Sequence, residues 1–240
     1  MQDTTSNNPN LLVLTLYIIG VSYVFNLMVE SIADQIKFAF DSATVNQQLK
    51  EQELDDKVTI AFKLSPSYDI DGLKDFLLIL SNKSDNVAVY VDWDNCSFVV
   101  KHKNVSRRVI RKSPNLSRDL AVPQTPSLVA PTQNLVQSIT AEDVFARDQE
   151  TGTYEAKKAL VDIAGLKSSP LRAQRKLYKN FISRRQQLEC SLQLALRFSE
   201  LPVGLVPGQN IPPMSIITCP FTIRKLPWTY AFPWNKKRKS

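Results

Sequence analysis

The feature that most constrains this chain is an uncharged run, Leu11–Met28, which starts after only ten residues. A hydrocarbon core of roughly 30 Å is crossed by about 20 apolar residues at 1.5 Å of rise per residue. The run therefore predicts a transmembrane helix over residues 11–30, preceded by a short tail of residues 1–10. Since no second run of this kind occurs, the sequence predicts a single-pass membrane protein.

The anchor is expected to contact lipid through the large side chains along this helix. These are Leu11, Leu12, Leu14, Tyr17, Ile18, Ile19, Val24, Phe25 and Met28. Two other interpretations stay open. A cleaved signal peptide would suit the small residues Ser31 and Ala33, although residues 1–10 lack the usual Lys or Arg. A buried core helix would normally carry polar residues at a spacing of about 3.6.

The charge distribution predicts on which side of the membrane the body lies. Residues 1–56 carry Lys37 and Lys50 against eight acidic residues, whereas the remainder carries 28 basic and 15 acidic residues. Because Lys and Arg are retained on the cytoplasmic side, the body is expected to be cytoplasmic.

After the span, an amphipathic helical pattern continues. Apolar residues recur at spacings of three and four from Val29 to Ala43, with charged residues between them. The pattern fades in the polar stretch 46–56. Residues 31–56 are therefore interpreted as a helical stalk.

From Lys57 the period of the apolar residues changes to two, as in half-buried strands. Strands are predicted over residues 58–64, 76–81, 87–93, 96–101, 107–111, 191–198 and 215–224. Short turn-forming stretches separate the earlier ones. Short strands separated by such turns predict a mainly β, antiparallel, immunoglobulin-like sandwich over residues 57–227.

Two interruptions and a tail complete the predicted organisation. Residues 113–132 contain four prolines and are interpreted as an extended crossover. Residues 154–190 are interpreted as a basic helical insertion. Residues 228–240 form a tail that combines aromatic and basic residues.

The insertion and the tail together predict contact with an anionic surface. Trp favours the headgroup region, and each basic residue near an anionic surface adds about 1 kcal/mol. The candidate residues are Arg172, Arg175, Lys176, Lys179, Arg184, Arg185, Trp228, Trp234, Lys236, Lys237, Arg238 and Lys239. The alternative is a solvated tail after a last strand, with its tryptophans packed on the sandwich.

No residue pattern indicates catalysis, and no cofactor or metal is expected. His102, the single histidine, lies between two lysines, where a surface position is expected. Asp92-Trp-Asp94 has the form of a metal-binding D-x-D pair, but a strand end that passes into a turn is the favoured interpretation and needs no ligand. Asp69-Ile-Asp-Gly72 lacks most of a calcium loop. Cys96, Cys190 and Cys219 form no C-x-x-C, so core cysteines are favoured over a Cys190–Cys219 disulfide.

Four Asn-x-Ser sequons, at Asn82, Asn95, Asn104 and Asn115, lie within 36 residues. They would mark a glycosylated face in a secreted chain. Because Asn and Ser are also common turn residues, and because the body is expected to be cytoplasmic, turns are the favoured interpretation.

Several features together resemble a family. They are the early span, Asn82-x-Ser84…Val89-x-Val91-x-Trp93, and the ending Cys219-Pro-Phe-Thr-Ile…Leu-Pro-Trp228…Pro-Trp234-Asn. The combination resembles uncharacterised membrane-anchored β-sandwich proteins of the kind met in cyanobacteria. The resemblance implies no known activity and no functional residues.

These observations lead to three hypotheses. The first is a membrane-anchored, non-enzymatic interaction or scaffold protein whose sandwich binds a protein partner, with the basic helix 171–185 taking part. The second is a polyanion-binding protein, for which anionic lipid suits the sequence better than nucleic acid, since no nucleic-acid motif is present. The third is an enzyme with an unrecognised site that uses Asp92 and Asp94.

Overall fold

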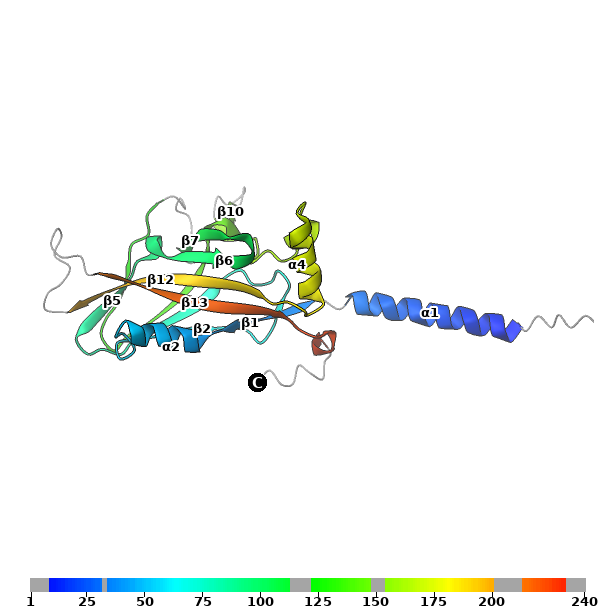
Figure 1. Cartoon of the computed structure of the whole chain (residues 1–240), viewed down its shortest axis with the longest axis horizontal. Coiled ribbons are helices and arrows are strands. Elements are labelled where there is room, and N and C mark those ends of the chain that lie inside the picture. The colour runs from blue at the N-terminus through cyan, green and yellow to red at the C-terminus, as the bar shows by residue number, and fades with distance from the viewer. Residues whose placement is uncertain (1–8, 32–33, 113–121, 148–153, 201–212, 232–240) are drawn as a thin grey trace, which may run out of the picture.

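The computed structural model describes residues 9–31, 34–112, 122–147, 154–200 and 213–231. Within these ranges the chain is mostly antiparallel β-structure with few α-helices (Figure 1). The helices are α1 (Pro9–Ser31), α2 (Ser42–Glu51), α3 (Gly165–Ser168) and α4 (Arg172–Ile182), with the 3₁₀ turns η1 (Trp93–Asn95), η2 (Lys101–Lys103), η3 (Glu142–Val144) and η4 (Trp228–Ala231).

The strands follow the period-two pattern for most of the chain. They are β1 (Gln35–Phe40), β2 (Val58–Lys63), β3 (Tyr68–Asp69), β4 (Phe76–Asn82), β5 (Val87–Val91), β6 (Ser97–Val100), β7 (Val105–Arg111), β8 (Ser127–Val129), β9 (Asn134–Ala141), β10 (Phe145–Arg147), β11 (Tyr154–Ala156), β12 (Leu188–Glu200) and β13 (Met214–Lys225). Each of the seven strands that alternation predicts is present, with ends that shift by a few residues.

The predicted sandwich is wrong, because the strands form one curved sheet, a half-barrel, instead of two stacked layers. Its order is β2-β4-β9-β7-β6-β12-β13-β1-β3, with β5 and β8 attached beside β12. The long strand β12 joins the parts, since it pairs with β13 along one side and with both β6 and β5 along the other. The strands β10 and β11 form a separate pair.

The two ends of this strand order meet through aromatic side chains. The ring of Phe40 on β1 lies 4.8 Å from that of Phe62 on β2. Phe76 of β4 stacks on Phe221 of β13 at 4.5 Å, and Phe62 contacts Phe221 at 4.9 Å. Contacts of this kind contribute about 0.5–1.5 kcal/mol each beyond the area they bury. The interior of the curved sheet is therefore a continuous core.

Helix α2 covers the opening between β13 and β2 (Figure 1). The side chain of Gln48 on α2 makes the hydrogen bonds that a neighbouring strand would make. Its Nε2 donates to the carbonyl of Thr218 at 2.7 Å, and its Oε1 accepts from the Thr218 N–H at 2.9 Å. Gln52 donates to the carbonyl of Ile216. These side chains satisfy the part of the β13 edge that lies beyond the paired stretch of β1.

The predicted helical stalk over residues 31–56 is wrong in its first half, which is the strand β1. Ile36 and Phe38 are buried in the core, and Phe40 packs against it. Ile36 and Phe40 fit a spacing of four as well as a period of two, whereas Phe38 fits only the period of two, and the helical interpretation left Phe38 out.

The predicted transmembrane anchor and single-pass membrane localisation are also corrected. Helix α1 forms and projects away from the sheet (Figure 1). However, no helix in the described ranges reaches the length and apolar character that a membrane crossing requires.

Candidate functional site

Helix α4 is the most strongly amphipathic element of the described chain. Phe181 on its inner side is fully buried, and Leu177, Tyr178 and Ile182 pack partly buried against the same core. At about 100° of rotation per residue, four basic residues lie on the opposite side of the helix, within an arc of roughly 100° around its axis. These are Arg172, Arg175, Lys176 and Lys179, all of them exposed. The apolar side fixes the helix and thereby sets the direction in which its charges point.

The chain after α4 extends this basic patch. Arg184 and Arg185 are exposed and follow the last helical turn. Arg184 has the left-handed backbone conformation, with φ of 62°, which glycine usually occupies at this place because other residues are strained there. We refer to Arg172, Arg175, Lys176, Lys179, Arg184 and Arg185 as the α4 surface.

The positive charge of the α4 surface is not balanced locally. No acidic residue occurs between Asp162 and Glu189. None of the six side chains makes an ion pair with a residue in the described ranges. The structure thus brings together six of the residues predicted to contact an anionic surface and leaves their charges open to a partner.

The other predicted contact residues are only partly placed. Trp228 begins η4, which lies, like α4, at the end of the sheet that carries α1 (Figure 1). The side chain of Trp228 and all of Trp234 and Lys236–Lys239 lie outside the described residues. The side chains of the predicted anchor from Leu11 to Phe25 are exposed, and that of Met28 is not described.

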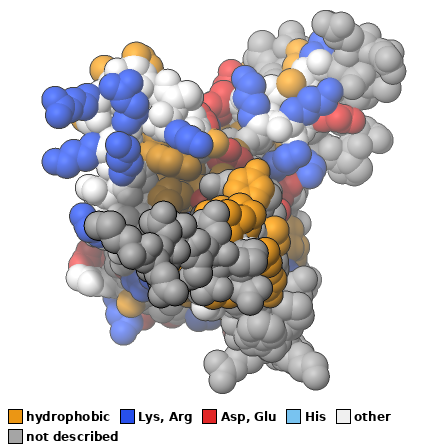
Figure 2. All heavy atoms as spheres, turned by 90° about the vertical axis from the view of Figure 1, so that its right-hand side faces the viewer, with side chains coloured by type: hydrophobic (Ala, Val, Ile, Leu, Met, Phe, Trp, Pro, Cys, Tyr) orange, Lys and Arg blue, Asp and Glu red, His pale blue; other side chains and the backbone are white. Residues whose placement is uncertain are grey.

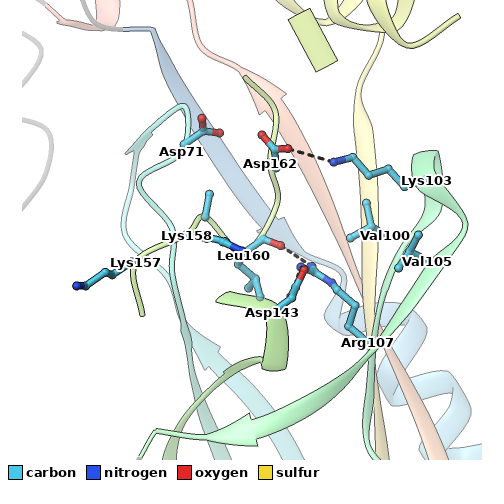
Figure 3. A pocket seen from close by; sticks show the side chains of 11 residues that line it. Asp71, Val100, Lys103, Val105, Arg107, Asp143, Lys157, Lys158, Leu160 and Asp162 are labelled. Atoms are coloured by element: carbon cyan, nitrogen blue, oxygen red, sulfur yellow. Dashed lines mark hydrogen bonds and ion pairs between the residues drawn. The ribbon is translucent and has the colours of Figure 1, made fainter. Parts of the chain in front are cut away.

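A pocket of about 770 Å³ lies beside residues 157–162, the segment that leads into α3. Val100 and Val105 form one wall, and Leu160 lies opposite them (Figure 3). Lys103 reaches across to Asp162 at 3.2 Å. Lower down, Arg107 donates to both carboxylate oxygens of Asp143, at 2.7 and 2.8 Å, and to the carbonyl of Leu160 at 2.5 Å.

Sequence reasoning missed this pocket, because its walls come from four separate stretches of the chain. They are the loop after β3, the η2–β7 segment, η3 and residues 157–162. The sequence carried only a faint signal, the basic pairs around His102 and at Lys157–Lys158. Those pairs did not reveal that three aspartates would join them.

The carboxylates of the D-x-D motif are held by arginines. Asp92 accepts from Arg197 at 3.1 Å, and Asp94 pairs with Arg108. Burial alone would raise the pKa of the Asp94 carboxyl, but hydrogen bonds from Arg108 and from the Gln124 N–H lower it below its usual range. Among the described residues, no group of three or more His, Cys, Asp or Glu is arranged to hold a metal.

The calcium-loop fragment has a structural role as well. Asp71 accepts from the backbone N–H groups of Ile163 and Ala164 and so supports the segment that leads into α3.

The three cysteines are free and buried, as the core interpretation predicted. Cys190 lies opposite Phe221 and Cys219 opposite Leu192, so the two cysteines are not cross-strand partners. Burial raises the pKa of the Cys96 and Cys190 thiols to about 12 and that of Cys219 further still. Such thiols are poor nucleophiles at neutral pH.

His102 is more buried than expected. Its imidazole nitrogens are enclosed and make no hydrogen bond to any described residue. Burial, with a smaller contribution from Lys103, lowers the pKa of His102 from 6.5 to about 4. The side chain is therefore neutral at physiological pH, and the expectation of a solvated surface histidine is wrong.

Two of the sequon asparagines serve local structure, in line with the turn interpretation. Asn82 is buried and donates to the carbonyls of Val87 and Val129. Asn104 ends η2 in the left-handed conformation.

Comparison with known proteins provides no relative: no family model, no curated protein and no solved structure matches this chain. The resemblance to membrane-anchored cyanobacterial β-sandwich proteins therefore stays a prediction.

Proposed function

We propose that this chain is a non-catalytic binding protein whose α4 surface docks an acidic segment of a protein partner. The single observation that carries the proposal is the set of six exposed cations, without ion-pair partners among the described residues, on one helix and the turn that follows it. Four of them lie between Arg172 and Lys179 of the helix, a length of about 11 Å.

The position of the charges along α4 supports a role in binding over one in stability. Arg172 and Arg175 stand near the start of the helix, whose first turn contains no acidic residue. The backbone dipole makes this end positive, so cations are unfavourable there and anions are attracted. An incoming carboxylate would relieve this unfavourable arrangement.

The surroundings of the helix favour a protein over a nucleic acid. Asp71 and Asp162 lie in the adjacent pocket, and Asp143 lies beyond them (Figure 3). In the end-on view, Lys and Arg gather in groups with acidic side chains between them (Figure 2). A continuous polyphosphate would meet these carboxylates and be repelled, whereas an acidic peptide can space its charges around them.

The proposal is tested with the full chain and poly-L-glutamate as the probe, measured by fluorescence anisotropy. A variant with Arg172, Arg175, Lys176 and Lys179 replaced by Gln is expected to bind about tenfold more weakly or worse, because four charge–charge attractions are removed. Its free energy of unfolding is expected to change by no more than about 0.5 kcal/mol per site.

A matched control removes the same net charge elsewhere. Four exposed lysines away from α4 serve for this, one on α2 and three on the sheet and its loops, namely Lys50, Lys63, Lys74 and Lys83, each replaced by Gln. If long-range charge alone drives binding, both variants lose affinity equally, and the proposal of a defined surface fails. Retention of near-normal affinity by the control supports it.

General polyanion binding is the second candidate, favoured by the overall charge of +7. It predicts that duplex DNA or vesicles rich in phosphatidylserine bind at least as tightly as poly-L-glutamate, with a steep loss of affinity as salt rises. Preference for the polypeptide at equal salt would favour the first candidate.

A further inference from the structure

The pocket and the α4 surface belong to one continuous region. Residues 157–162 line the pocket, and the chain then runs through α3 directly into α4, with α3 and α4 in contact. Tyr178 lies on the side of α4 that faces the core. Its partial burial, and the nearby carboxylates of Asp34 and Asp71, raise the pKa of the Tyr178 hydroxyl. The pocket is therefore near the core-facing side of α4, and a segment that docks on the cations has to pass around the helix to enter it.

The charges inside the pocket are mostly committed to one another. Asp143 is held by Arg107, Asp162 by Lys103, and Asp71 by two backbone N–H groups. Lys158, by contrast, is exposed and makes no ion pair with a described residue. The pocket thus offers carboxylate oxygens with free lone pairs at fixed positions, and one cation that is available to an incoming acidic group.

Aliphatic side chains line part of the space between these charged groups. Val100 and Leu160 contribute little exposed surface, whereas Val105 keeps 44% of its surface exposed (Figure 3). The volume of 770 Å³ falls within the range of about 300–1,000 Å³ that is typical of pockets that receive ligands. This volume is larger than a carboxylate or a methyl group would fill. The aliphatic part of the lining can pack against the face of an aromatic ring.

We infer that this pocket receives an aromatic side chain with a polar tip, such as tyrosine, from the acidic segment that docks on α4. The ring lies between the valine wall and Leu160, and its hydroxyl donates to a pocket carboxylate. Acidic residues on either side of the aromatic residue meet Lys158 and the α4 surface. This inference rests on the proposed function and specifies the partner segment as acidic with one aromatic anchor.

The test compares three polypeptide probes that differ in the residue placed among the glutamates. Poly-L-glutamate, a glutamate–alanine copolymer and a glutamate–tyrosine copolymer of equal length are titrated against the full chain at fixed salt. The wild-type chain is expected to bind the tyrosine copolymer about tenfold more tightly than the alanine copolymer, since a buried aromatic anchor dominates such interfaces.

Three substitutions test whether this preference belongs to the pocket. Val105→Gln makes the wall polar at an exposed position, and Val136→Gln makes the same change on β9, where Val136 is 57% exposed and does not line the pocket. The first is expected to abolish the preference for tyrosine and to leave binding of poly-L-glutamate unchanged. The second is expected to keep the preference. Ala159→Phe, which fills the pocket from its other side, is expected to behave like Val105→Gln.

The outcomes separate the two proposals. Equal affinity for the alanine and tyrosine copolymers, with both still dependent on the α4 cations, overturns the aromatic anchor and leaves the docking function intact. Equal loss of the preference in Val105→Gln and Val136→Gln also overturns it, because general surface stickiness would then explain the result. Failure of all three probes to bind removes the docking function itself.

Discussion

The charged residues of the sheet and those of α4 have opposite surroundings. On the sheet, arginines are matched by acids, as in Asp92–Arg197, Asp94–Arg108 and Asp143–Arg107. On the α4 surface, six exposed cations have no ion-pair partner in the described chain. Charges that only keep a fold soluble and stable are usually interspersed in sign. The difference agrees with our proposal that the α4 surface docks an external anion, whereas the charges of the sheet stabilise the fold.

The largest expected effect concerns the core of the sheet. Phe76 is 1% exposed, stacks on Phe221 and contacts Phe38, Phe62 and Phe98. Phe76→Ala is expected to lower the free energy of unfolding by about 3–5 kcal/mol, as measured by urea denaturation. Under conditions where the variant stays folded, its affinity for poly-L-glutamate should equal that of the wild type. A parallel loss of affinity would show that the two regions are not independent.

The next effect concerns the paired charges. Asp92→Ala leaves Arg197 without its carboxylate, in a pair whose side chains are only 24% and 16% exposed. A cost of about 1–3 kcal/mol is expected. Glu189→Ala breaks the exposed Lys101–Glu189 pair and is expected to cost no more than about 1 kcal/mol. Equal costs for both substitutions would contradict the view that pairing on the sheet is structural.

A smaller effect of the opposite sign is expected at the end of α4. Arg184 occupies the left-handed conformation with φ of 62°, which costs roughly 1–2 kcal/mol for a residue other than glycine. Arg184→Gly should therefore raise the free energy of unfolding by about 1 kcal/mol while it weakens binding of poly-L-glutamate. Arg185→Gly, at a position without positive φ, should weaken binding without stabilising the fold. Such a contrast would show that stability is sacrificed for charge at Arg184.

The smallest effect at neutral pH concerns His102. Burial lowers its pKa from 6.5 to about 4, so folding favours the neutral imidazole. The contribution of the neutral His102 imidazole to the free energy of unfolding is fully present above pH 6.5. It is lost as the pH falls from 6.5 towards 4, and it changes no further below pH 4. His102→Gln should match the wild type in stability at pH 7.5 and lose less than the wild type between pH 6.5 and pH 4.5. Identical pH profiles would contradict the buried, neutral state.

The strands and the basic face of α4 could be predicted because both depend on local periodicity. Val58–Lys63 and Val87–Val91 alternate as half-buried strands do, and the cations of α4 recur on one side of a helix. The strand β1 could not be distinguished from a helix, since Ile36 and Phe40 fit both periods. The predicted anchor is not supported, since no helix of the described residues is long and apolar enough to cross a membrane.

The pocket could not be predicted at all. Lys103 and Asp162 are 59 residues apart and meet only because β6, β7 and the segment before α3 converge. Likewise, the lysines on either side of His102 in the sequence gave no indication that the imidazole nitrogens would be enclosed. Pairing across such separations depends on strand order, and periodicity carries no information about strand order.

By itself, the sequence determined seven of the strands, which side of α4 is apolar, and that the positive charge of α4 has no acidic neighbour along the chain. These features follow from interactions between residues a few positions apart. Only the tertiary structure decided that the strands close into one curved sheet through Phe40 and Phe62, and that three aspartates and three lysines assemble beside α4. Alternation sets which face of a strand is buried, but the neighbouring strand is chosen by packing of the whole core.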